Sequence, residues 1–425
     1  MLTHPPQIVA LIFVVLFSLT PLRSTTVADE KAGDSTLGQL TTWLTEQEMD
    51  DENLRALTEQ SFAAAPLTKD EASEATSKLW RSRTEFLRKS SQAEFDAREI
   101  VIGELKMPFW YKVFGETLAG GRSLFISMHG GGGAPAAVND QQYENQKKLY
   151  QPEEGVYLVP RAPTNTWDLW HQSHIDEFFD RLIADMIVFE NVNPDRVYIM
   201  GYSAGGDGVY QLAPRMADRL AAAAMMAGHP NESRPEGLRN IGFTIHMGAK
   251  DAAYNRNAKA EEWGKLLDAL QANDKEGYVH DVVLHADRGH WMNLEDAVAL
   301  PWMARFTRNV WPDRIAWIQD DVRHNRFYWL RGSMHTAKAG DRMMASVKGN
   351  EIHIEHSDAA TVSVLLNDRL LNLDEPVTVT LPSGAMSQRT VIRTIRSIAE
   401  SALERFDQSA AYSAQIDVSL SADEN

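Results

Sequence analysis

The sequence predicts an α/β fold in which a mostly parallel sheet is covered by helices on both faces. Between residues 99 and 312, short apolar strand-like runs alternate with longer helical stretches, the order that builds strand–helix–strand units. The two flanking segments have different residue patterns. Residues 29–98 are rich in helix formers, and residues 313–425 contain short runs of alternating polar and apolar residues that predict strands. We therefore expect a central α/β domain between a helical N-terminal extension and a small β-rich C-terminal region.

The N-terminal extension, residues 29–98, is acidic, and its leucines recur near helical spacing, as at Leu37, Leu40 and Leu44. The sequence around Pro66 and Asp70 is typical of a break followed by the N-cap of a new helix. We expect two or three amphipathic helices that pack against the central domain, and no catalytic group among them.

The central domain, residues 99–312, is predicted to contain strands buried on both faces, because their apolar runs are nearly continuous. Sheets of this kind place their chemistry in the loops that follow the carboxyl ends of the strands. Helices are predicted at 175–189, 258–272 and 294–308. The predicted strands are 99–106, 110–114, 123–128, 156–159, 196–200, 221–226, 243–247 and 279–284.

The C-terminal region begins after Trp311 and Pro312. It contains no nucleophile motif, so packing or surface recognition is its expected role. Strands are predicted at 350–355, 361–366, 377–381 and 415–420, with one helix at 391–406.

Composition excludes several classes of function. The 425 residues carry 42 basic and 59 acidic side chains, a net charge of −17, which argues against nucleic-acid or anionic-membrane partners. Cysteine is absent, which removes disulfides, thiolate catalysis and sulfur-ligated metals. His171 and His174 share a helical face but lack a third ligand at a recognisable spacing, so we expect neither a metal nor a cofactor.

The first residues predict export. Residues 8–19 are almost unbroken in apolar character but are too few to span a bilayer, which takes about 20 residues. Thr26, Val27 and Ala28 then form a small-residue pattern typical of signal-peptide cleavage. We expect residues 1–28 to be removed after Ala28, giving a periplasmic or secreted protein without a stable membrane span. An uncleaved anchor or a buried helix is the alternative.

The strongest motif is Gly201-Tyr202-Ser203-Ala204-Gly205, which follows a predicted strand and precedes a helical stretch. This is the G-x-S-x-G pattern, in which a sharp strand-to-helix turn exposes a nucleophilic serine. The positive end of the following helix favours the negative charge that develops in the reaction. Ser203 is therefore the predicted nucleophile.

A second glycine-rich loop, His129 followed by residues 130–133, comes directly after the strand predicted at 123–128. Neither G-x-G-x-x-G nor G-x-x-x-x-G-K-[ST] can be drawn through it, which excludes the common phosphate-binding loops. The run fits the H-G-G-G loop, whose backbone N–H groups bind an acyl oxyanion. We predict Gly131, Gly132 and Ala204 as the donors, and a flexible glycine turn is the alternative.

A serine nucleophile requires a base, and the base requires an acid that orients it. His290 lies six residues after the strand predicted at 279–284, and Asp251 lies four residues after the strand at 243–247. Asp287 and Asp281 compete for the acid's role. The acid must approach the imidazole from the side opposite the serine, and this favours Asp251, which lies on a different strand end.

Aromatic and histidine side chains near these loops are candidates for a substrate pocket. Trp167 and Trp170 follow a central strand and would line an acyl or sugar pocket or fill the core. The predicted pocket residues are His129, Tyr202, Trp167, Trp170, His171 and Trp291.

Residues 129–133 and 201–206, with Asp251 and His290, resemble the α/β-hydrolase superfamily. Within it, the chain is most similar to the secreted esterase and poly(3-hydroxybutyrate)-depolymerase-like group, and also resembles dienelactone-hydrolase and prolyl-oligopeptidase-type sequences. The resemblance covers residues 100–312, about half of the chain. It implies the α/β-hydrolase fold, attack of Ser203 on an acyl carbon, proton transfer to His290 and support of the imidazole by Asp251.

The leading hypothesis is an exported serine hydrolase that cleaves a carboxylic ester, small or polymeric, through an acyl-enzyme. One alternative is a peptidase of the prolyl-oligopeptidase type, although residues 29–98 lack the repeated strands of a propeller. The other is a catalytically silent hydrolase fold that acts as a binding protein. The sequence leaves the individual substrate and the oligomeric state open.

Overall fold

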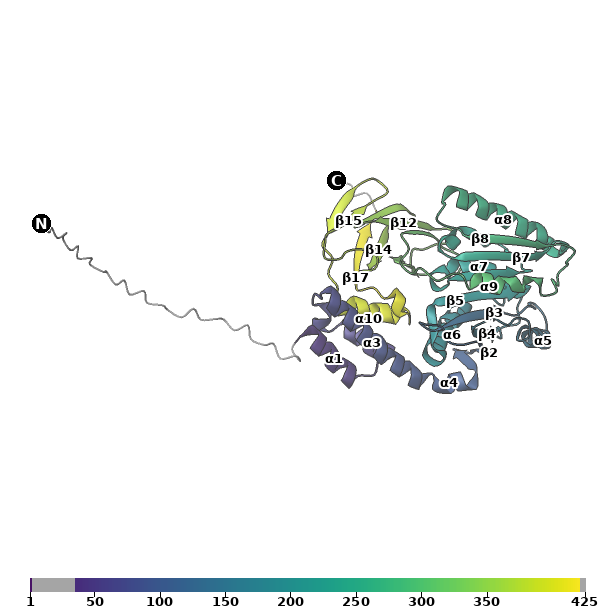
Figure 1. The fold of residues 1–425 in the computed structure, drawn as a ribbon, viewed down its shortest axis with the longest axis horizontal. Coiled ribbons are helices and arrows are strands. Elements are labelled where there is room, and N and C mark those ends of the chain that lie inside the picture. The colour runs from purple at the N-terminus through teal and green to yellow at the C-terminus, as the bar shows by residue number, and fades with distance from the viewer. Residues whose placement is uncertain (2–34, 421–425) are drawn as a thin grey trace.

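The computed structural model describes Met1 and residues 35–420, so the predicted signal segment lies outside the described residues. The central domain is an eight-stranded sheet in the order β1-β2-β4-β3-β5-β6-β7-β8 (Figure 1). Strands β3 to β8 are parallel, whereas β1 and β2 are antiparallel to their neighbours. The predicted α/β class is confirmed. The strands are β1 (Glu99–Ile102), β2 (Leu105–Phe114), β3 (Arg122–Met128), β4 (Gly155–Pro160), β5 (Val192–Tyr202), β6 (Ala222–Met226), β7 (Gly242–Gly248) and β8 (His280–His285).

Both faces of this sheet are covered. Successive side chains of a strand point to opposite faces, and in β3 Leu124 and Ile126 join one apolar cluster while Phe125 joins another. The first cluster includes side chains of α6, α7 and α8, and the second includes side chains of α9. The helices are α5 (Ala136–Gln146), α6 (His174–Glu190), α7 (Ala204–Arg215), α8 (Arg256–Asn273) and α9 (Ala299–Met303).

The helix predicted at 294–308 is much shorter than expected. Leu294 has φ of 62°, which is not helical, and only a 3-10 turn (Glu295–Val298) and the five residues of α9 follow. Beyond α9 the Arg308 N–H donates to the Asp195 carbonyl at the start of the sheet. The chain beyond α9 is held instead by hydrogen bonds between Arg308 and Asp195.

The N-terminal extension forms four helices instead of two or three. Thr68 caps the longest of them and exchanges hydrogen bonds with Glu71, so the predicted break near Pro66 is present. The helices are α1 (Thr36–Glu46), α2 (Asp51–Thr58), α3 (Lys69–Ser90) and α4 (Gln92–Ala97). Their leucines share an apolar cluster with Ile395 and Ile398 of α10 (Ile395–Glu404). The two ends of the described chain therefore pack on each other, and Figure 1 shows α10 beside α3.

The C-terminal region consists of two sheets and α10. The five-stranded sheet has the order β16-β15-β13-β12-β9 and the four-stranded sheet the order β10-β11-β14-β17. Trp317, Phe327 and Tyr412 belong to the same continuous apolar cluster as the central sheet. The strands are β9 (Arg314–Ile318), β10 (Arg326–Phe327), β11 (Leu330–Arg331), β12 (Arg342–Lys348), β13 (Glu351–Ser357), β14 (Thr361–Leu366), β15 (Val377–Thr380), β16 (Met386–Arg389) and β17 (Ala414–Ser419).

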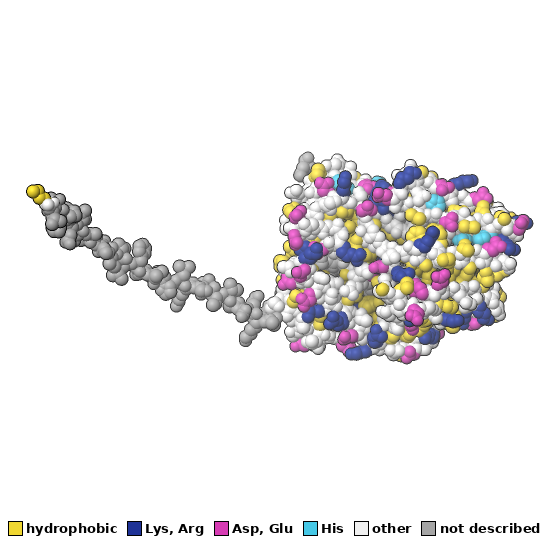
Figure 2. All heavy atoms as spheres, viewed as in Figure 1, with side chains coloured by type: hydrophobic (Ala, Val, Ile, Leu, Met, Phe, Trp, Pro, Cys, Tyr) yellow, Lys and Arg dark blue, Asp and Glu magenta, His cyan; other side chains and the backbone are white. Residues whose placement is uncertain are grey.

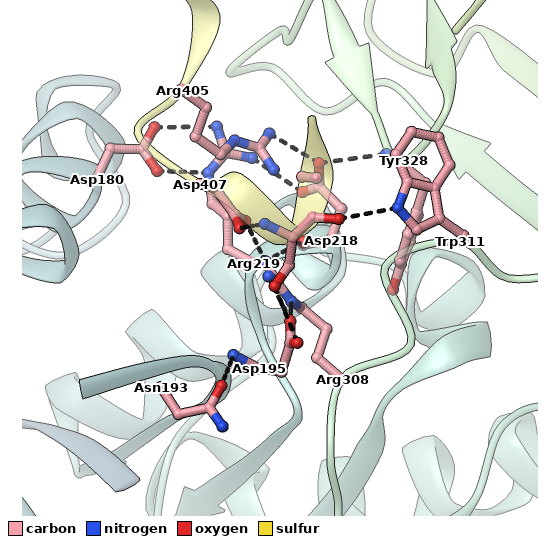
Figure 3. A network of polar contacts seen from close by, with 12 residues as sticks. Asp180, Asn193, Asp195, Asp218, Arg219, Arg308, Trp311, Tyr328, Arg405 and Asp407 are labelled. Atoms are coloured by element: carbon pink, nitrogen blue, oxygen red, sulfur yellow. Dashed lines mark hydrogen bonds and ion pairs between the residues drawn. The ribbon is translucent and has the colours of Figure 1, made fainter. Parts of the chain in front are cut away.

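A buried network of ion pairs joins the C-terminal region to the amino end of the central sheet (Figure 3). Asp218 is fully buried and accepts hydrogen bonds from Arg219 at 2.9 Å and Arg405 at 2.8 Å. Arg308 donates to Asp195 and to Asp407, both at 2.7 Å. Charges without water are stable only when they are paired in this way. The C-terminal region is thus fixed to the central domain by charge as well as by apolar packing.

The outer surface mixes both signs of charge. Acidic and basic side chains are interspersed over the face drawn in Figure 2. Among the described residues, no helix is long and apolar enough to cross a bilayer.

Asp185 on α6 gives a test of how burial affects stability. Burial raises the pKa of Asp185 to about 7, Arg181 offsets this only in part, and the Oδ2 atom has no hydrogen-bond partner in the described chain. Between about pH 4 and pH 7 the unfolded chain has lost a proton that the folded chain keeps, so stability falls as pH rises through that window. Asp185→Asn should raise the free energy of unfolding by about 2–4 kcal/mol at pH 8 and leave it unchanged at pH 3.5. Urea unfolding at both pH values measures this, and an equal change at both would contradict it.

Candidate active site

Ser203 lies at the sharp turn between β5 and α7. Its φ of 58° is in the left-handed region, which a residue with a side chain adopts only under constraint. The turn is closed by close backbone approaches: a Cβ on Gly201 would meet the Gly205 carbonyl oxygen at 2.2 Å, and one on Gly205 would meet the Met128 carbonyl oxygen at 2.2 Å. The two glycines are therefore required by packing, and together they present Ser203 at the N-terminus of α7.

Ser203, His290 and Asp251 are brought together from three strand ends. The Ser203 Oγ lies 2.9 Å from His290 Nε2, and His290 Nδ1 lies 2.7 Å from Asp251 Oδ2. Asp251 is 3% exposed and accepts the Nδ1 proton, which leaves Nε2 free to accept the proton of the serine hydroxyl. The three groups form a continuous hydrogen-bonded line.

The competing aspartates lie elsewhere. The Asp287 side chain is 84% exposed and pairs with Lys250 at 2.6 Å, on the surface. Asp281 is on β8. Neither makes a hydrogen bond to His290 in the described chain, where Asp251 occupies Nδ1.

Tyr202 holds the loop that carries His290. Its hydroxyl donates to the His290 carbonyl at 2.6 Å and accepts from the Met292 N–H at 2.9 Å. Tyr202, a predicted pocket residue, borders a cleft, but only 7% of it is exposed. Its main contacts are with the backbone of the histidine loop.

The glycine loop is held by Asn139 of α5, which was not among the predicted site residues. Asn139 Oδ1 accepts the Gly132 N–H at 3.0 Å, and its Nδ2 donates to the Gly132 carbonyl at 3.1 Å. The Gly132 N–H is therefore already engaged. The N–H groups of Gly131 and Ala204 donate no hydrogen bond within the described chain, and Ala204 is the first residue of α7, where N–H groups lack helical partners. These two N–H groups are the ones available to an oxyanion.

His129 and Trp170 are structural and do not line a pocket, contrary to the sequence expectation. Both are fully buried. His129 Nε2 accepts the Ala162 N–H at 3.1 Å and its Nδ1 donates to the Gly130 carbonyl at 2.6 Å, while Trp170 Nε1 donates to the His129 carbonyl at 2.9 Å. Burial lowers the pKa of His129 to about 4, so the ring stays neutral and keeps this arrangement. Together they fix the loop that carries the glycines.

One hollow borders the catalytic serine, and a second borders Trp167. A cleft of about 630 Å³ is bordered by Ser203, His290, Tyr202, Leu149 and the half-exposed Trp291. A groove of about 560 Å³ is bordered by Trp167 and His171. Of the six predicted pocket residues, the structure thus places Tyr202, Trp167, His171 and Trp291 on a hollow.

The two tryptophans of the 167–170 loop allow a matched comparison. Trp170→Phe removes the hydrogen bond to a buried carbonyl and part of the packed volume, and should lower the free energy of unfolding by about 1–3 kcal/mol. Trp167 is 64% exposed, and Trp167→Phe should change it by about 0.5 kcal/mol or less. Urea denaturation of both variants measures the difference. Equal losses of stability in the two variants would contradict the assignment of Trp170 as buried and Trp167 as exposed.

Comparisons with known proteins agree with this architecture. The model of the dienelactone hydrolase family matches residues 149–320. A bifunctional acetylxylan esterase/xylanase of Neocallimastix patriciarum is 32% identical over 117 residues, which is 27% of this chain. The chain spans only 17% of the length of that relative.

Solved structures of esterases are also similar. A thermostable esterase has 17% sequence identity and a TM-score of 0.38, covering 49% of this chain and 62% of its own. A poly(3-hydroxybutyrate) depolymerase from Bordetella parapertussis has 15% identity and a TM-score of 0.36, covering 48% of this chain and 86% of its own. Residues 149–320, which include Ser203, Asp251 and His290, are therefore similar to the dienelactone hydrolase family.

Proposed function

We propose that this protein is a serine hydrolase that cleaves carboxylic esters through an acyl-enzyme. The observation that carries the proposal is the hydrogen-bonded line from Ser203 Oγ through His290 to Asp251, with separations of 2.9 and 2.7 Å. Nucleophile, base and orienting acid within hydrogen-bond reach of one another are the parts that acyl transfer requires.

In the first half of the reaction, the Ser203 hydroxyl transfers its proton to His290 Nε2 as Oγ attacks the carbonyl carbon of the ester. The oxyanion that forms accepts hydrogen bonds from the N–H groups of Gly131 and Ala204, at the positive end of α7. The proton on His290 then passes to the departing oxygen, the bond from carbon to that oxygen breaks, and the alcohol leaves.

In the second half, His290 removes a proton from a water molecule, which attacks the acyl carbon. The bond to Ser203 Oγ breaks, the proton returns to the serine and the carboxylic acid leaves. Asp251 keeps the Nδ1 proton throughout and stabilises the imidazolium that forms in each half. The partial likeness to an acetylxylan esterase is consistent with an ester as the substrate.

The test is hydrolysis of p-nitrophenyl acetate and butyrate, compared with peptide p-nitroanilides. We expect release of p-nitrophenol from the esters at rates at least a hundredfold above those for the anilides, and none from the Ser203→Ala variant. Faster cleavage of the anilides would identify a peptidase. If the folded wild-type protein cleaved neither substrate and failed to react with a fluorophosphonate, it would be a silent binding protein.

A further inference from the structure

The groove beside Trp167 is built jointly by the central domain and the C-terminal region. On one side it is lined by the loop that leads into α6, including Trp167, Asp168 and His171. On the other side lie Asp321 and Arg323, which follow β9 in the C-terminal region. A hydrolase domain alone would lack this second wall.

One wall of the groove, Trp167, lies close to the glycine loop of the active site. A Cβ placed on Gly132 would lie 3.8 Å from Trp167 Cα and 3.9 Å from Ala204 Cβ, so the glycine loop is in close reach of both. Trp167 thus stands next to the residue that follows the nucleophile. Trp167 is therefore a lining residue of the groove that also lies close to the glycine loop of the active site.

His171 is the side chain that points to a ligand. Only 9% of it is exposed, it borders the groove, and neither ring nitrogen makes a hydrogen bond within the described chain. Its ring meets the Trp167 indole edge to face, with the centroids 5.5 Å apart. The ring nitrogens are not enclosed by protein, so they are open to the groove, where a ligand can form hydrogen bonds with them.

The chemistry of the lining selects among partners. Asp168, Glu232 and Asp321 disfavour an anion, and the Arg323 guanidinium offsets one of their three charges. Burial lowers the pKa of His171, which keeps the ring neutral, with one N–H donor and one acceptor nitrogen. A hydroxyl group is the natural complement of such a pair. The exposed indole adds an apolar face on which the C–H side of a sugar ring can lie.

We propose that this groove binds the hydroxyl-rich part of the substrate, so that the enzyme acts on esters of carbohydrates. The sugar ring stacks on Trp167, and its hydroxyls bond to His171 and to the carboxylates of Asp168 and Asp321. The acyl group then occupies the cleft beside Trp291, across the glycine loop. The substrate class rests on the proposed ester hydrolysis, whereas binding of a sugar in the groove does not.

Binding is tested in the full-length Ser203→Ala protein by calorimetry with unesterified xylotetraose, cellotetraose and mannotetraose. We expect at least one of them to bind with a Kd in the millimolar range or below, and Trp167→Ala, His171→Phe and Asp321→Asn each to weaken binding at least tenfold. Tyr254→Ala is the matched control, because Tyr254 is an exposed aromatic that does not line the groove, and it should leave binding unchanged. Asp321 is on the surface, so its replacement keeps the test valid even if His171→Phe fails to fold.

Kinetics supply the second readout. The ratio of kcat/KM for a monoacetylated oligosaccharide to that for p-nitrophenyl acetate should fall at least tenfold in Trp167→Ala and Asp321→Asn. Failure of all three oligosaccharides to bind, or an unchanged ratio in both variants, would overturn the inference. Binding of spermidine or choline that is lost in Asp321→Asn, without sugar binding, would also overturn it in favour of a cation site. A protein that binds sugar but hydrolyses no ester would refute the proposed function and leave the groove's role standing.

Discussion

Replacement of Asp251 by asparagine is expected to lower kcat for ester hydrolysis by about 10⁴ while leaving the fold intact. The Asp251 carboxylate accepts the Nδ1 proton of His290 at 2.7 Å and so keeps Nε2 unprotonated and facing Ser203. An asparagine amide in its place can donate to Nδ1, which favours the tautomer with the proton on Nε2, where it can no longer accept the serine proton. Stopped assays with p-nitrophenyl acetate and circular dichroism measure the two effects.

Asp287→Asn is the matched control for this change, because Asp287 is only three residues from His290 in the sequence. Its exposed carboxylate pairs with Lys250, and surface pairs of this kind contribute about 0–1 kcal/mol. Asp287→Asn should therefore retain kcat within a factor of about two. A collapse of activity in Asp287→Asn together with an active Asp251→Asn would assign the acid to the wrong aspartate.

Asp218→Asn is expected to lower the free energy of unfolding by about 3–5 kcal/mol, although the residue lies far from Ser203 in the fold. Burial alone would raise the pKa of Asp218, but the guanidinium groups of Arg405 and Arg219 outweigh it and hold that pKa well below its usual range. The neutral amide leaves both guanidinium groups without their shared counter-charge in a site that water does not reach (Figure 3). Urea unfolding at pH 7 measures the loss.

The control for Asp218 is Glu262→Gln in the exposed Lys259–Glu262 pair, whose atoms are 2.7 Å apart. The ion pairs of Asp218 have similar separations, so distance alone would predict a similar loss in both variants. Because the Lys259–Glu262 pair is exposed, we expect Glu262→Gln to change the free energy of unfolding by only about 0–1 kcal/mol. Similar losses in the two variants would contradict the view that the network fixes the C-terminal region to the central domain.

The central fold and its three convergent residues could be predicted because their signals are local. The glycines around Ser203 are required by a turn of only a few residues, so a short motif reveals them. Parallel strands end at one edge of the sheet, and this rule predicted that His290 and Asp251 lie near that turn. Local motifs and strand ends do not indicate which side chains of a nearby loop are buried and which face solvent. Trp170 is buried because it packs against Gly208 of α7, and nothing within its own loop distinguishes it from the exposed Trp167.

Long-range contacts also explain what was missed in the flanking regions. Asp218 and Arg405 are 187 residues apart in the chain, and α10 completes a core begun by the N-terminal helices. Neither pairing has a spacing that a sequence pattern could reveal. Asn139 could have been suspected, since a polar residue soon after a glycine-rich loop is well placed to hold it, yet its burial was needed to show this role.

The central claim, covalent catalysis by Ser203, is tested most directly by intact-protein mass spectrometry of enzyme quenched in acid during turnover of p-nitrophenyl acetate. We predict that the wild-type chain gains the mass of one acetyl group, that peptide mapping places it on Ser203, and that Ser203→Ala neither gains the mass nor turns over the ester. Turnover that persists in Ser203→Ala, or wild-type turnover during which no acyl group is trapped on Ser203, would contradict the account.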